Sequence, residues 1–160
     1  MHSGYRSEDI AAAAERAHRK LRRDMLIALA FVAAALLLTG RTGRGMKLEL
    51  GPEALAVTPA GGPAVAVRYE DMLGTLLRGE IDFGTCLEGG QTDACWFGTW
   101  ENGEWGRYTL CVHPKVECFA IIELMDGSRV VVNGATERET AELAEALRKL
   151  KDMRGGTAGE

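Results

Sequence analysis

The chain has 160 residues, of which 46% are hydrophobic, 26% charged and 6% aromatic, and its net charge is -4. This length suits one domain with a short appendage and excludes two full domains, and the composition excludes a wholly disordered chain. The 20 glycines show no G-x-y period, which excludes collagen. The acidic balance excludes a generally basic nucleic-acid-binding protein, so no nucleic-acid partner is expected.

The charge is divided unevenly along the chain. Eight basic and four acidic residues precede Met46, whereas 11 basic and 18 acidic residues lie between Met46 and Arg154. The first segment is therefore net +4 and the second net -7. Such an asymmetry indicates contact with a membrane or a nucleic acid, and the hydropathy of the first segment favours the membrane.

An apolar run of 14 residues extends from Met25 to Leu38 and is lengthened by Thr39-Gly40. At about 1.5 Å per residue it covers roughly 24 Å of a hydrocarbon core about 30 Å thick. The arginines that flank both ends can extend the effective span by snorkelling. We expect an uncleaved transmembrane anchor over residues 24–40, which contacts the lipid bilayer from Met25 to Gly40. A cleaved signal peptide and a buried core helix are the alternatives.

The segment before the anchor predicts a basic juxtamembrane helix over residues 1–23, with Ser7 as its N-cap. Five basic residues precede the apolar run closely and three follow it: Arg16, Arg19, Lys20, Arg22 and Arg23 against Arg41, Arg44 and Lys47. The positive-inside rule then predicts a single-pass protein of the cell membrane, with a cytoplasmic N-terminus and an extracytoplasmic C-terminal domain.

Beyond a linker at residues 41–45, the hydrophobic period changes to two, which predicts β-strands. The expected strands are Lys47–Leu50, Ala54–Thr58, Ala64–Tyr69, Asp71–Leu77, Cys95–Trp100, Arg107–His113, Cys118–Met125 and Arg129–Asn133. Asp126-Gly127 between the last two predicts a hairpin with a type I′ turn. Asp71–Leu77 has the weakest strand pattern of these eight segments, so about seven strands are expected, in a partly open antiparallel barrel or sandwich.

One helix is expected at the end of this domain, which we place at residues 46–154. Thr136-x-x-Glu139 is a capping box, and an apolar stripe follows at helical spacing: Thr140, Leu143, Leu147 and Leu150. Gly155-Gly156 is expected to end the helix, and residues 155–160 to form a disordered tail. The fold class expected is mainly β, with one C-terminal α-helix that covers the open end of the sheet.

Four short segments carry a family resemblance: Gly106–Leu110, Phe119–Ile121, Val130–Asn133 and Glu139-Thr140. In their order, Met46–Met153 resembles the bacterial pleckstrin-homology-like (PH-like) domain, particularly its membrane-anchored kind. The resemblance implies a barrel capped by the helix, which serves as a binding or scaffolding module without catalytic residues or a cofactor. Phosphoinositide-binding members of the wider fold use basic residues in the first hairpin loop. Gly51-Pro-Glu-Ala54 has none, so phosphoinositide binding is not expected.

Four cysteines lie beyond the anchor: Cys86, Cys95, Cys111 and Cys118. If the domain is extracytoplasmic, disulfides are expected, and Cys86–Cys95 with Cys111–Cys118 is one of three connectivities. A two-residue turn at Pro114-Lys115 would place Cys111 opposite Cys118. The alternative is four free thiols packed as small hydrophobic residues.

Cysteine and histidine could also serve chemistry, but the spacing argues against it. Cys111-x-His113 followed by Cys118 does not match the usual structural zinc pairs, so no metal site is expected. A thiol nucleophile at Cys111 with His113 as base has no identifiable third group, and we expect no enzyme activity.

All three tryptophans lie within ten residues, together with one phenylalanine: Trp96, Phe97, Trp100 and Trp105. On a strand, Trp96 and Trp100 would share one face and Phe97 the other. These residues could form an exposed platform for a sugar, a peptide or a protein, or they could fill a core otherwise built from small residues.

The function expected is a membrane-anchored, non-catalytic interaction or scaffolding module that binds a protein partner, with strand addition at an open sheet edge as one route. The alternative function is a ligand-binding domain for a sugar or a peptide that uses the tryptophan cluster.

Overall fold

The computed structural model describes residues 20, 22, 25 and 45–155 of the chain. The predicted helix at residues 1–23, the anchor at residues 24–40, most of the linker and residues 156–160 lie outside these described residues, apart from the three isolated positions. Among the described residues, no helix combines the length and the apolar character needed to cross a bilayer.

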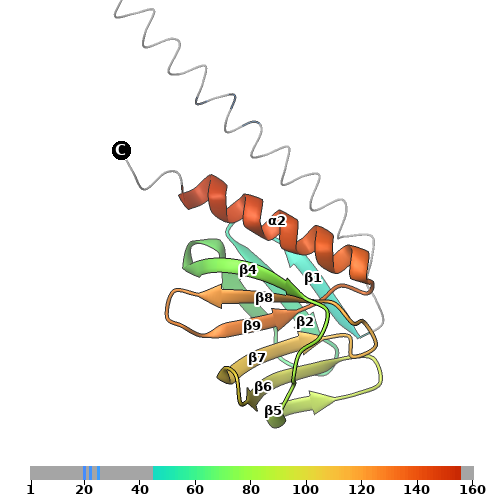
Figure 1. Ribbon diagram of the computed structural model, residues 1–160. Helices are drawn as coiled ribbons and strands as arrows, with labels where there is room; N and C mark the ends of the chain where they lie inside the picture. The colour runs from blue at the N-terminus through green and yellow to red at the C-terminus, as the bar shows by residue number, and fades with distance from the viewer. Residues whose placement is uncertain (1–19, 21, 23–24, 26–44, 156–160) are drawn as a thin grey trace, which may run out of the picture.

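The described residues form nine strands in two sheets, one short 3-10 helix and one long C-terminal helix (Figure 1). The prediction of a mainly β domain with one C-terminal helix is confirmed. In chain order the elements are β1 (Met46–Leu50), β2 (Ala54–Pro59), β3 (Val65–Arg68), η1 (Tyr69–Asp71), β4 (Met72–Arg78), β5 (Thr85–Gln91), β6 (Trp96–Asn102), β7 (Gly106–Val112), β8 (Phe119–Leu124), β9 (Arg129–Val132) and α2 (Glu137–Gly155).

The first three strands form an antiparallel sheet in the order β1-β2-β3. Alternation along these strands buries Leu55, Val57 and Val67 on one face, as the period of two predicts. Gly51-Pro52 separates β1 from β2, and the Tyr69 hydroxyl donates to the Gly51 carbonyl at 3.0 Å. This bond ties the first hairpin to the start of η1.

The other six strands form a sheet in the order β4-β8-β9-β7-β6-β5. β7 and β9 are parallel, so the expectation of about seven strands in a purely antiparallel arrangement is wrong in this detail. β9 folds back on β8 as a hairpin and occupies the place between β8 and β7. Because β7 and β8 run in opposite directions within this sheet, β9 is parallel to β7 and antiparallel to β8.

The β8–β9 hairpin forms at the predicted Asp126-Gly127. Its turn is not of type I′, which needs positive φ at two residues, because only Gly127 has positive φ there (84°). The Gly127 amide donates to the Leu124 carbonyl at 3.0 Å, and Asp126 accepts bonds from the Ser128 amide and hydroxyl. The loop is therefore a three-residue connection with glycine at its left-handed position.

Helix α2 begins with the predicted capping box. The Glu139 amide donates to Thr136 Oγ1 at 3.1 Å, and the Glu139 carboxylate accepts from the Ala135 amide at 3.0 Å. The helix continues through Gly155, one residue beyond the predicted boundary. Its predicted apolar stripe is buried: Thr140, Leu143, Leu147 and Leu150. Figure 1 shows α2 running alongside β4, and it also contacts η1 and β8.

Two apolar clusters lie on the two faces of the six-stranded sheet. The inner core joins this sheet to β1–β3 and α2, and its members include Leu55, Val57, Val67, Phe97, Cys95, Cys111, Ile122, Val132, Leu143 and Leu147. The outer aromatic cluster covers the opposite face, with Trp100, Tyr108, Leu110, Val112, Phe119, Ile121 and Val131 buried and Ile81, Phe83, Cys86, Trp96 and Trp105 packed against them. Apolar side chains therefore cover both faces of the six-stranded sheet.

Candidate interaction surface

The four aromatic residues predicted as a binding surface do not share an exposed face. Trp96 and Trp100 lie on the outer face of the sheet and Phe97 on the inner one, as strand alternation predicts. Trp100 is 1% exposed and Phe97 8%, so neither can present a platform. The Phe97 ring fills the space beside Gly62 and Gly90, where an added Cβ would overlap it. Both residues supply core volume.

The remaining tryptophans are half-buried within the outer aromatic cluster. Trp96 stacks on Trp100 with centroids 5.6 Å apart and an interplanar angle of 10°. Phe83, from the β4–β5 loop, packs edge-on against Trp96 at 5.2 Å. The Tyr108 hydroxyl donates to the Phe83 carbonyl at 2.8 Å and holds this loop over the sheet. The aromatic residues therefore pack against the protein's own β4–β5 loop and form a second small core.

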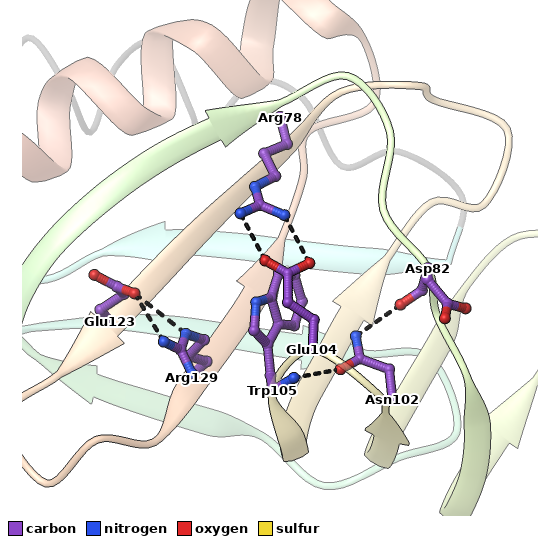
Figure 2. A network of polar contacts seen from close by, with 7 residues as sticks. All are labelled: Arg78, Asp82, Asn102, Glu104, Trp105, Glu123 and Arg129. Carbon is purple, nitrogen blue, oxygen red and sulfur yellow. Dashed lines mark hydrogen bonds and ion pairs between the residues drawn. The ribbon is translucent and has the colours of Figure 1, made fainter.

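Trp105 lies between two arginines in the polar network of Figure 2. The Arg78 guanidinium is 5.5 Å and the Arg129 guanidinium 5.9 Å from the Trp105 ring, within the range of cation–π attraction. Arg78 also forms a two-pronged ion pair with Glu104, at 2.8 and 2.9 Å. Each guanidinium already has an internal carboxylate partner, since Arg129 pairs with Glu123 at 3.1 Å. The network fixes the β6–β7 turn and presents no free cation to an anionic ligand.

Asn102 completes this turn. Its side-chain amide donates to the Asp82 carbonyl at 2.7 Å, and its oxygen accepts from the Trp105 amide at 2.7 Å (Figure 2). One asparagine thus joins the β6–β7 turn to the β4–β5 loop. The sequence pattern does not show this role, because the partner Asp82 is 20 positions away.

The ion pair predicts a measurable shift at Glu104. The hydrogen bonds from Arg78 hold the pKa of the Glu104 carboxyl below its ordinary value, with a smaller contribution from the Trp105 side chain. A depressed pKa stabilises the folded state above the unfolded pKa, and this contribution is lost as the pH falls through the folded pKa. In Arg78→Ala we expect the Glu104 pKa to rise toward its ordinary value in a carboxyl NMR titration. An unchanged pKa would contradict the ion pair.

The four cysteines are free, and the strand register separates the pairs proposed as disulfides. Cys86 pairs with Trp100, whereas Cys95 precedes Trp96 at the other end of the β5–β6 hairpin. The two cysteines are therefore on the order of 15 Å apart, against a Cα limit of about 7 Å for a disulfide.

The Cys111–Cys118 pair fails for a different reason. It requires β7 and β8 to be neighbours, but β9 lies between them and pairs through Val132 with both Cys111 and Ala120. Two strand spacings of about 4.8 Å separate the strands, so Cys118, just before β8, cannot reach Cys111. The alternative of free thiols packed as small hydrophobic residues describes the arrangement in this structure.

Burial makes two of these thiols poor nucleophiles. It raises the pKa of Cys95 to about 11 and the pKa of Cys111 to about 12, the latter with a further contribution from Cys95. We expect all four cysteines to be alkylated when the unreduced chain is denatured, and Cys95 and Cys111 to react slowly with a thiol probe in the folded protein at neutral pH. Mass spectrometry gives both readouts. Fewer than four alkylated cysteines would indicate a disulfide.

His113 is held by backbone contacts. Its Nδ1 lies 2.9 Å from the Ala94 carbonyl, and its backbone is bridged in both directions by the buried Asn133 side chain, at 2.7 and 3.0 Å. Asn133 extends the β7–β9 pairing beyond the last strand residues, a role that sequence reasoning did not assign. Among the described residues, no three His, Cys, Asp or Glu side chains cluster in a way that could hold a metal ion.

The exposed apolar side chains of β4 form the remaining candidate. Leu73 is 56% exposed, Leu76 48% and Leu77 38%. A bulge between Met72 and Gly74 leaves Leu73 without a cross-strand partner, and regular pairing with β8 resumes at Gly74. β4 is the last strand on its side of the six-stranded sheet. We call residues 73–77 of this strand the β4 edge.

The register shows how the backbone of the β4 edge is oriented. The Met125 amide donates to the Asp71 carbonyl at 2.9 Å, so the odd-numbered residues of β8 turn their backbone groups toward β4. Ile121 is one of these residues, and it pairs with Leu76. The N–H and C=O of Leu76 therefore face β8, and those of its neighbours on either side face away from the sheet.

These neighbours are Thr75 and Leu77; Leu77 is partly exposed, whereas Thr75 is buried (6% exposed) where α2 packs against β4. Arg148 of α2 donates from Nε to the Thr75 carbonyl at 3.0 Å. The Thr75 amide and both backbone groups of Leu77 form no further hydrogen bond within the described part of the chain. The β4 edge thus combines the outward-facing backbone groups of Leu77 with exposed leucine side chains, whereas α2 and its Arg148 cover the edge at Thr75.

The other outer strands carry the usual protections against strand pairing. β1 contains Lys47 and Glu49, which form an ion pair at 2.7 Å. β5 contains a bulge between Cys86 and Glu88 as well as the charge of Glu88. β3 has only four residues and ends at Arg68. Between Met72 and Leu77, β4 has no charged residue and no proline; its own protections are the bulge between Met72 and Gly74 and the contact with α2.

Comparison with known proteins does not assign the chain to a family. No family model, no curated protein and no solved structure matches it.

Proposed function

We propose that this protein is a membrane-anchored, non-catalytic interaction module that binds a protein partner by strand addition at the β4 edge. The observation that carries the proposal is the outward-facing backbone of Leu77 beside the exposed side chains of Leu73, Leu76 and Leu77. An added strand would gain main-chain hydrogen bonds from the edge and would cover apolar surface that water now contacts.

The proposal includes the anchor over residues 24–40 and an extracytoplasmic position for the domain. The apolar run, its flanking arginines and the excess of basic residues on its N-terminal side support both. The proposal also retains the PH-like domain type. The C-terminal helix packed beside the sheet supports that type, whereas nine strands with a parallel β7–β9 pair depart from the expected plan.

Co-purification from mild detergent tests the proposed function. Two differently tagged copies of the full chain are co-expressed, so that both a foreign partner and a second copy can be detected. Leu76→Lys places a charge on the edge, and Leu87→Lys serves as the matched control because Leu87 is similarly exposed (45%) on the opposite outer strand, β5.

We expect a partner to be retained by the wild-type chain and by Leu87→Lys and lost from Leu76→Lys. Recovery of the wild-type chain alone and monomeric would overturn the proposal. Equal retention by all three chains would also overturn it, because the partner would then bind elsewhere.

A further inference from the structure

We infer that Asn102 is a site of spontaneous covalent modification, in which the amide nitrogen of Gly103 displaces ammonia from the Asn102 side chain. The inference goes beyond the proposed function and does not rest on it. The chain has two asparagines, and each is followed by glycine: Asn102-Gly103 in the β6–β7 turn and Asn133-Gly134 before α2. The structure holds the first pair in a reactive arrangement and the second in a protected one.

Gly103 supplies an unhindered nucleophile. The backbone nitrogen that follows an asparagine can attack the side-chain carbonyl carbon of that asparagine, and a side chain on the second residue obstructs the attack. Gly103 is exposed in the turn and has open space where a Cβ would be added. Its amide forms no hydrogen bond to another described residue. The reacting groups belong to adjacent residues, so the attack is intramolecular.

The carbonyl group of the Asn102 side chain is polarised for this attack. Its oxygen accepts a hydrogen bond from the Trp105 amide at 2.7 Å (Figure 2). When the Gly103 nitrogen adds to the carbonyl carbon, negative charge develops on that oxygen, and a backbone N–H already in place stabilises it. The Asn102 side chain is buried, but the attacking atom belongs to the next residue and does not enter from solvent.

The β4–β5 loop restrains the leaving group. Asn102 Nδ2 donates to the Asp82 carbonyl at 2.7 Å. The loop that supplies this acceptor is held in turn by the Tyr108 hydroxyl, which donates to the Phe83 carbonyl at 2.8 Å. Asp82 is exposed and lies outside regular secondary structure. Local opening of the loop releases the amide, so the rate of modification should rise when the loop is loosened.

Asn133 is the protected counterpart. It is fully buried, and its side chain forms three hydrogen bonds to backbone groups of His113 and Val116, at 2.7, 3.0 and 3.2 Å. The Gly134 amide donates to Thr140 Oγ1 at 2.9 Å, which holds this nitrogen against the first turn of α2. Attack by Gly134 would require several of these buried bonds to break.

Water is the only co-reactant that the reaction needs. A bond forms between the Gly103 nitrogen and Asn102 Cγ, the Cγ–Nδ2 bond breaks, and the amide proton of Gly103 leaves with Nδ2 as ammonia. Water then opens the resulting succinimide ring at one of its two carbonyls. Opening at one carbonyl gives an aspartate at position 102, and opening at the other gives isoaspartate, in which the backbone runs through the former side chain.

Both products disrupt the polar network of Figure 2. A carboxylate at position 102 cannot donate to the Asp82 carbonyl, and it adds negative charge to a turn that already contains Glu101 and Glu104. Isoaspartate also lengthens the backbone where position 102 pairs with Gly106. The β4–β5 loop therefore loses its tie to the β6–β7 turn, and the outer aromatic cluster loses part of its cover.

Ageing of the purified full chain tests the site. The chain is incubated in mild detergent at mildly alkaline pH, beside the same chain in denaturant and beside folded Gly103→Ala. Peptide mass spectrometry measures the fraction modified at each asparagine, and chromatography separates the aspartate and isoaspartate products. Asn133 is an internal control in every sample.

We expect Asn102 to be modified at least several-fold faster than Asn133 in the folded chain, with isoaspartate among the products. In denaturant the two rates should be similar, because unfolding removes the protection of Asn133. Gly103→Ala should slow the reaction at Asn102 at least several-fold. Modification of Asn133 as fast as that of Asn102 in the folded chain would overturn the inference. So would a folded Asn102 that stays intact while the denatured chain is modified.

Two variants test the link to the β4–β5 loop. Tyr108→Phe removes the hydroxyl that holds the Phe83 carbonyl and should raise the rate at Asn102 by about 2- to 10-fold, the equivalent of one hydrogen bond, without changing Asn133. Asn102→Asp reproduces one product and should unfold at a lower denaturant concentration than the wild-type chain. An unchanged rate in the first variant and an unchanged midpoint in the second would overturn the link.

Discussion

Replacing Gly98 with alanine should destabilise the domain by about 3 kcal/mol or more, enough to lose the β5–β6 pairing in a marginally stable chain. Gly98 has a φ of 117°, which residues with a side chain rarely adopt. It pairs with Gly89, itself at a φ of 134°, and an added Cβ would overlap the Glu88 carbonyl oxygen. Backbone strain and overlap act together, because neither strand can move away without breaking the ladder.

Chemical denaturation of the full chain in detergent measures this effect. Gly103→Ala is the matched control, because Gly103 lies in the neighbouring turn without a positive φ and has open space where a Cβ would be added. We expect the control to change the free energy of unfolding by less than about 0.5 kcal/mol. A comparable loss in both variants would show that the β5–β6 contact does not need glycine.

Replacing Trp100 with alanine should cost about 3–5 kcal/mol of unfolding free energy. Trp100 is 1% exposed and stacks on Trp96, and its ring centroid lies 6.2 Å from that of Phe83. Its removal therefore leaves a cavity under the β4–β5 loop, which covers the outer face of the sheet. If the tryptophans instead formed an open platform, the same substitution would affect ligand binding and leave stability almost unchanged.

Two further variants make the Trp100 result specific. Trp100→Phe should cost much less than Trp100→Ala, because a ring is kept and the buried Nε1, which has no hydrogen-bond partner among the described residues, is removed. Met125→Ala should change stability by no more than about 0.5 kcal/mol, because Met125 is 70% exposed. Equal losses in Trp100→Ala and Met125→Ala would contradict a core role for Trp100.

The parts of the fold that could be predicted are those that neighbouring residues determine. Alternation placed Trp96 and Trp100 on one face and Phe97 on the other, because side chains alternate along any strand. Thr136 and Glu139 predicted the start of α2, since a capping box operates over four residues. Asp126-Gly127 located a hairpin correctly, although the turn type differs.

The parts that were missed depend on long-range pairing. β5 was not predicted because Gly89 and Gly90 have low strand propensity, and the segment is a strand only because β6 pairs with it. The placement of β9 between β7 and β8 leaves no local trace, so Cys111 and Cys118 seemed to be neighbours. The same limit applies to the candidate site, because alternation along residues 72–78 cannot show that β4 lies at the margin of the sheet.

Amide hydrogen exchange along β4, measured on the full chain purified in mild detergent with its bound partner, tests the β4 edge most directly. Leu76 provides an internal reference, since its amide faces β8 within the sheet. The account predicts that the Leu77 amide exchanges as slowly as the Leu76 amide, because a partner strand accepts its hydrogen bond. Rapid exchange at Leu77 beside slow exchange at Leu76 would show an open edge and would contradict the account.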